Sequence, residues 1–149
     1  REVMMKDIFK GGFCHHDFAH HNILIVDKGK VKIIDFDYCI LDSNLHDLSS
    51  LLLRAMKNGR WEIEKSELIL NSYGEEKAIR QEQIPIMAAF MEFPQDYWQI
   101  GIQYYWEQQS YGEDFFVNRL RKIKEDILDK QEFIEAFRLY KLHGGREWV

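Results

Sequence analysis

Ionisable and amide side chains near the start of the chain have types and spacing that suit phosphoryl transfer. His15 and Asp17 are followed, after four intervening residues, by Asn22. Asp35 and Asp37 come after two short apolar runs. Phosphoryl transfer needs a carboxylate that accepts the proton of the attacking hydroxyl, and oxygen ligands that hold Mg²⁺ against the nucleotide phosphates. These residues are therefore a candidate catalytic and metal-binding set.

The residues between the two groups predict a β-hairpin. Residues 23–26 and 31–34 are short β-branched runs, and the Asp-Lys-Gly-Lys segment at 27–30 is a turn signal. A hairpin returns its second strand to the starting point of the first. Polar groups placed before the first strand and after the second are therefore expected to lie on one side.

The rest of the chain has helical periodicity. Asn44 and Asp47 resemble a capping box, and the Asn58-Gly59 pair ends the helix that they begin. Further helices are expected at residues 62–73, 83–93, 94–110, 113–129, and from there to about 142. Residues 1–10 resemble the end of a helix that Gly11-Gly12 stops. We predict one domain over residues 1–149, mostly α with a small β-hairpin (α+β).

Composition limits the classes of function. A formal charge of −5 argues against nucleic-acid binding, and no apolar run approaches the ~20 residues that span a membrane. Cys14 and Cys39 are too few for a disulfide framework, so we expect a reduced, cytoplasmic protein. The chain begins at Arg1, which suggests part of a longer protein.

The polar segment resembles known phosphotransferases. His15-His16-Asp17 with Asn22, followed by Asp35-Phe36, is similar to the H-x-D-x-x-x-x-N and D-F-x loops of protein kinases. It is more similar still to aminoglycoside phosphotransferases and choline kinases. The resemblance implies that Asp17 is the catalytic base, that Asn22 and Asp35 bind Mg²⁺, and that ATP is the phosphoryl donor. It also implies the C-terminal lobe of a kinase-like fold, with the nucleotide-binding residues in an N-terminal lobe that this chain lacks.

The same resemblance assigns supporting roles. His15 would brace the metal loop, Asp37 would belong to that loop, and Asp47 would hold the catalytic loop. His16 is a departure, because these families have Gly at this position. Without the upstream phosphate loop and Lys–Glu pair, we predict that the isolated chain binds ATP weakly and turns over little or nothing.

Other segments resemble the CotS-type spore coat proteins of endospore-forming bacteria. The similarity includes residues 14–17, 22–25 and 34–39, and extends to 52–61, 69–73 and 93–105. Two functions follow: an ATP- and Mg²⁺-dependent phosphotransferase acting on a small-molecule hydroxyl, or a catalytically silent structural protein of the spore coat. The second would make other coat proteins its partners and place the chain in the coat during sporulation.

Two alternatives concern other clusters. His15, His16, His20 and His21 lie close together beside Cys14, which leaves a Zn²⁺ or Ni²⁺ site open, although the spacing matches no common finger. The aromatic stripe within residues 98–106 is favoured as a buried helix face over an acceptor pocket. Cys39 is expected to be a buried small hydrophobe.

Overall fold

The computed structural model describes residues 12–57 and 59–142, and the predicted helix over residues 1–10 lies outside these ranges. The strands are β1 (Phe13–Cys14), β2 (Ile23–Val26), β3 (Lys30–Ile33) and β4 (Ile40–Leu41). The helices are α2 (Asn44–Met56), α3 (Ile63–Glu76), α4 (Ile84–Glu92), α5 (Gln95–Gly101), a π-helical turn (Ile102–Trp106) and α6 (Glu113–Leu139). Short 3-10 turns occupy His20–Asn22, Asp27–Gly29 and Gln81–Gln83. The fold is mostly helical with small antiparallel sheets, as predicted.

Two antiparallel pairs of strands frame the polar loops. β2 pairs with β3 in the register Ile23 to Ile33, which confirms the predicted hairpin. β1 pairs with β4, so that Phe13 lies opposite Leu41. The sequence did not indicate this second pair, because two-residue strands carry no readable periodicity. The segment from β1 to β2 and the segment from β3 to β4 are thus each fixed at both ends.

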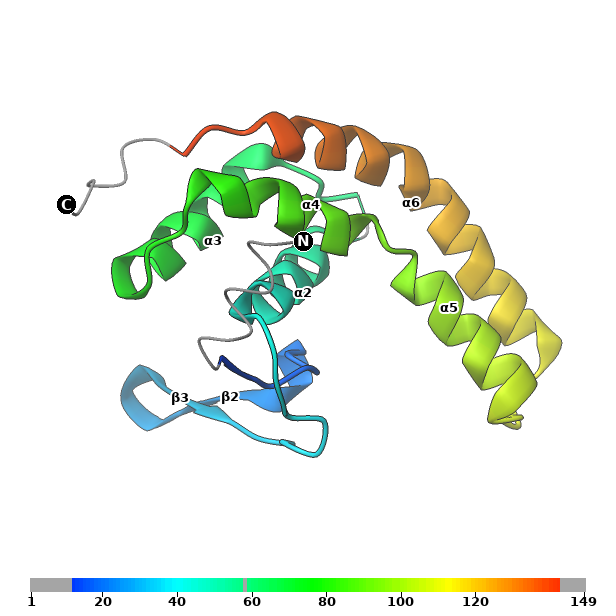
Figure 1. The fold of residues 1–149 in the computed structure, drawn as a ribbon. Helices are drawn as coiled ribbons and strands as arrows, with labels where there is room; N and C mark the ends of the chain where they lie inside the picture. The colour runs from blue at the N-terminus through cyan, green and yellow to red at the C-terminus, as the bar shows by residue number, and fades with distance from the viewer. Residues whose placement is uncertain (1–11, 58, 143–149) are drawn as a thin grey trace.

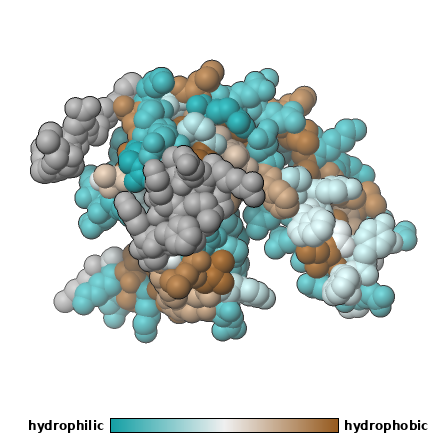
Figure 2. Space-filling view, viewed as in Figure 1, coloured by the Kyte–Doolittle hydropathy of each residue, from teal (hydrophilic) through white to brown (hydrophobic). Residues whose placement is uncertain are grey.

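The hydrophobic core lies between α2, α4 and α6, which are layered above the hairpin in Figure 1. Leu52 and Met56 of α2 are completely buried, as are Met87 and Met91 of α4 and Phe137 of α6. Figure 2 shows apolar side chains also gathered over the strands at the bottom of the view. The core therefore anchors α2, the helix that faces the polar loops.

Several predicted helix ends are wrong. The two helices expected after residue 113 form one continuous helix, because no Gly or Pro interrupts the chain between Glu113 and Leu139. Gly74 lies inside α3 rather than ending it. Ser43, not Asn44, is the N-cap of α2, and its Oγ accepts from the backbone N–H of Leu45.

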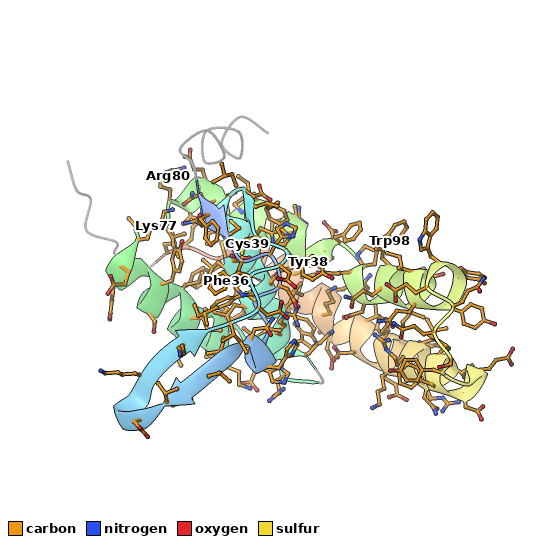
Figure 3. All side chains as sticks on the ribbon, turned by 90° about the horizontal axis from the view of Figure 1, so that it is seen from below. Phe36, Tyr38, Cys39, Lys77, Arg80 and Trp98 are labelled. Carbon is orange, nitrogen blue, oxygen red and sulfur yellow. The ribbon has the colours of Figure 1, made fainter. Side chains whose placement is uncertain are left out.

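The aromatic stripe is exposed, contrary to the favoured prediction. Trp98 is 61% exposed, Tyr105 79% and Trp106 87%. α5 and the first half of α6 extend away from the core as a two-helix arm, and no other described element covers the outer side of α5 (Figure 1). Figure 3 shows Trp98 on this arm. Within the described residues, no helix combines the length and apolarity needed to cross a bilayer.

Candidate active site

The candidate site is at the open end of the hairpin. The backbone N–H of Ile34 donates to the carbonyl of Asn22 at 3.0 Å, one step beyond the Ile23–Ile33 pair. Asn22 and Asp35 therefore flank the same end of the two strands. Figure 3 shows Phe36, Tyr38 and Cys39 of the β3–β4 segment, which continues from this end. The hairpin thus brings the two predicted metal ligands together across 13 positions of sequence.

Asp17 is held from two directions. The amide Nδ2 of Asn22 donates to the Asp17 carbonyl at 3.0 Å and to its Oδ2 at 3.2 Å. The guanidinium of Arg54, on α2, donates to Asp17 Oδ1 at 2.9 Å. Among the described residues, each carboxylate oxygen therefore has one protein donor and keeps lone-pair capacity for a further hydrogen bond. Sequence reasoning missed Arg54, which is seven residues after Asp47 and so lies on the same face of α2.

His15 links the two loops. Its side chain is buried, and its Nε2 lies 2.9 Å from the carbonyl oxygen of Ile34. Because a carbonyl only accepts, Nε2 carries the hydrogen in this contact. The ring also packs against Phe36, with centroids 4.9 Å apart, and against Phe18 at 5.9 Å. The imidazole thus joins the loop that carries Asp17 to the residue that precedes Asp35.

Asp47 binds the backbone of the loop that carries Asp17 rather than capping its own helix. Its Oδ2 accepts from the N–H of His15 at 2.6 Å, and its Oδ1 accepts from the N–H of His16 at 2.9 Å. Burial raises the pKa of Asp47, but the neighbouring His46 and these two N–H donors outweigh it, so the pKa of Asp47 is lowered overall. His46 Nδ1 lies 3.9 Å from Asp47 Oδ1, too far for a hydrogen bond, and acts through its charge when protonated.

Replacing Asp47 by Asn is expected to destabilise the protein by about 2 kcal/mol at neutral pH, because the two N–H groups bond to different carboxylate oxygens and an amide offers only one oxygen. A lowered folded-state pKa means that the carboxylate stabilises the fold above its ordinary value of 3.8 and loses this effect as the pH falls through the folded value. The difference in unfolding free energy between wild type and D47N should therefore shrink as the pH falls below about 4. Denaturant unfolding at several pH values measures it, and a pH-independent difference would contradict this account.

His16 adopts a left-handed backbone conformation with φ of +66°, and Asp35 does so with φ of +63°. A β-carbon is disfavoured in this region, which explains why the resembling families have Gly at the position of His16. The imidazole turns onto His46, with ring centroids 4.1 Å apart and planes 7° apart, and its Nε2 lies 3.7 Å from Asp42 Oδ2. His16 thus packs against α2 instead of crowding the loop.

At position 16, Gly is expected to give a more stable protein than Ala, by about 1 kcal/mol. Both variants lose the stacked ring, but only Ala keeps the β-carbon at positive φ. Paired thermal unfolding of H16G and H16A measures this difference. An Ala variant as stable as the Gly variant would show that the loop relaxes away from the left-handed conformation.

The donor set at the hairpin end fits Mg²⁺. Because Asn22 donates through Nδ2, its carbonyl Oδ1 is the atom left for a metal. Asp35 is exposed, and no hydrogen bond or ion pair engages its carboxylate in the described part of the chain. Both groups are hard oxygen donors of the type Mg²⁺ prefers. Asp37 is also exposed, and its charge contributes to raising the pKa of Cys39 after burial and Asp47.

The four histidines are not gathered as ligands around one point in the described residues. Across residues 12–57 and 59–142, no three His, Cys, Asp or Glu side chains converge as metal ligands. The rings of His15 and His16 face different partners, and His20 and His21 are exposed. Burial raises the pKa of Cys14 to about 11, which keeps its thiol protonated. Cys39 is partly exposed rather than buried as predicted.

Comparisons with known proteins bear on the family and the fold of the chain. Residues 7–85, just over half of the chain, match the phosphotransferase enzyme family. A 3-deoxy-D-manno-octulosonic acid kinase of Vibrio parahaemolyticus is 39% identical over 70 residues, which cover 47% of this chain and 24% of that protein. The crystal structure of an aminoglycoside phosphotransferase from Alicyclobacillus acidocaldarius superposes with a TM-score of 0.78 at 20% identity, covering 93% of this chain and 41% of that one. The chain thus spans about a quarter of the length of the Vibrio kinase and about two-fifths of the length of the Alicyclobacillus phosphotransferase.

Proposed function

Because this chain belongs to the phosphotransferase enzyme family, we propose that the intact protein transfers the γ-phosphoryl group of ATP to a hydroxyl of a small molecule. The observation that carries the proposal is the convergence of Asp17, Asn22 and Asp35 at one end of the hairpin, with Asn22 bonded to Asp17. Asn22 and Asp35 would hold Mg²⁺. This chain supplies the C-terminal half of the site, and the remainder would come from an N-terminal lobe.

In the proposed reaction, Asp17 orients the acceptor hydroxyl and takes its proton. A bond forms between the acceptor oxygen and the γ-phosphorus, the bond from that phosphorus to the β–γ bridging oxygen breaks, and ADP leaves. Mg²⁺, when bound, neutralises charge on the phosphate oxygens. His15 and Asp47 do not touch the reacting atoms in this scheme. They hold the two loops in the geometry described above.

The acceptor is proposed to bind in a cleft of about 640 Å³ that is lined by α2, residues 94–97 and α6. The cleft includes Lys57, the C-cap of α2 three residues after Arg54, and Lys57 pairs with Asp96. Lys130 also lines it, and burial lowers the pKa of this lysine, offset in part by Asp96. Interleaved cations and carboxylates supply donors and acceptors for a hydroxylated molecule. The Vibrio relative, named as the kinase of an acidic sugar, supports this class of acceptor.

A structural role in the spore coat is the second proposal. It is supported by the resemblance to CotS-type proteins over residues 52–61, 69–73 and 93–105, outside the catalytic segment. In this role the protein would bind other coat proteins in an endospore-forming bacterium, and the two loops would be kept for folding alone.

Nucleotide binding by the intact protein separates the two proposals. We expect isothermal titration to show ATP binding that strengthens with Mg²⁺. A lack of binding with ATP up to about 1 mM, the top of the usual KM range, would contradict the enzyme and favour the coat protein. The isolated chain serves as the matched comparison, because it should bind ATP far more weakly than the intact protein.

A further inference from the structure

Arg54 is the one cation that contacts the predicted catalytic base in the described part of the chain. Its Nη2 lies 2.9 Å from Asp17 Oδ1, and the two side chains are 34% and 32% exposed. Asn22 occupies the other carboxylate oxygen, at 3.2 Å. The terminal torsion of an aspartate is broad, so one hydrogen bond leaves the carboxylate plane free to rotate. Donors on both oxygens fix this plane.

The position of Arg54 is fixed by the contacts of α2 with the loop and with the core. It lies two turns after Asp47 on α2, and Asp47 binds the loop backbone through the N–H groups of His15 and His16. The adjoining face of the helix buries Leu52 and Met56 completely. One face of α2 therefore holds the loop at its backbone and, through Arg54, at the Asp17 side chain.

Fold stability does not account for this pair. Exposed ion pairs contribute little to folding stability, and both side chains here are about one-third exposed. The Arg54–Asp17 ion pair matters more for orienting a catalytic group than for stability. Misplacing a reacting group by about 1 Å costs about 10²-fold in rate. We propose that Arg54 is a positioning residue for phosphoryl transfer, which acts by fixing the carboxylate of Asp17 toward the acceptor hydroxyl. This inference rests on the proposed function.

The test is a double-mutant cycle on the intact protein, with ATP and the acceptor that it phosphorylates, or with water as acceptor if none is found. R54Q is expected to lower kcat by about 10–100-fold while KM for ATP changes less than about threefold, and R54K should recover part of the loss. K65Q, which breaks the similarly exposed Lys65–Glu62 pair on α3, should match wild type. Because Arg54 acts through Asp17, adding R54Q to D17N should cost nothing more.

The outcomes separate the positioning role of Arg54 from the proposed phosphoryl transfer. If wild type shows turnover that D17N lowers by about 10²-fold or more, the proposed function holds, and the R54Q result then decides the role of Arg54. Wild-type kcat in R54Q, a higher kcat in R54Q, or an equal loss in the D17N background would each overturn the positioning role. If wild type shows no turnover at all, both the proposed phosphoryl transfer and the positioning role of Arg54 fail.

Discussion

Replacing Asp17 by Asn in the intact protein is expected to lower kcat by about 10²–10⁴-fold, the usual contribution of a general base. Asn has the shape of Asp and keeps one oxygen toward Arg54, but it cannot take the proton of the acceptor hydroxyl. ATP affinity should change little, because Asp17 is proposed to contact the acceptor hydroxyl and not Mg²⁺ or the nucleotide. Steady-state kinetics and titration with Mg²⁺-ATP measure the two quantities.

Asp27 offers a matched control for this substitution. It lies in the exposed turn between β2 and β3, in the same hairpin, and its side chain has no role in the site. D27N removes the same charge by the same chemical change and should retain wild-type kcat. If D17N and D27N were equally active, Asp17 would not be the base, and the loop would be retained for folding.

The placement of the site followed from the sequence because it depends on local structure. Ile23–Val26 and the run at 31–34 signal a hairpin, and a hairpin brings Asn22 and Asp35 to one end. The four residues between Asp17 and Asn22 form a single 3-10 turn and its approach, which allows the amide to reach back to Asp17. Short-range patterns were sufficient for these contacts.

Long-range contacts could not be predicted from such short-range patterns. Arg54 bonds to a residue 37 positions earlier, and nothing in its neighbourhood distinguishes it from a solvated helix residue. Asp47 fits a capping box by spacing alone, yet its carboxylate reaches 32 positions back to His15. Only the resemblance to phosphotransferases predicted that Asp47 binds the loop. The i, i+7 spacing of Asp47 and Arg54 could be read from the sequence, but it points to Asp17 only once Asp47 is known to bind the loop that carries Asp17.

The prediction that the aromatic stripe is buried was wrong for a related reason. Periodicity predicts which residues share a face of a helix, but whether that face is covered depends on the neighbouring layer. Ile100 is buried on α5, whereas Trp98 and Tyr105 point to solvent on the same arm. No local signal shows that the arm leaves the three-helix core.

Replacing Asp35 by Asn is expected to weaken Mg²⁺-ATP binding by at least about 100-fold and to lower turnover by about 10³-fold or more, because a direct metal ligand matters more than its outer-shell partners. Asp35 is suited to this role because its carboxylate is exposed, has no partner in the described residues, and stands beside Asn22 at the hairpin end. ATP binding without Mg²⁺ should be nearly unchanged in D35N, which separates metal loss from misfolding. Asp37, two positions later, is the competing carboxylate. A larger loss of Mg²⁺ dependence in D37N than in D35N would assign the metal to Asp37 instead, and the β3–β4 segment would then have to turn the other side of its loop toward Asn22.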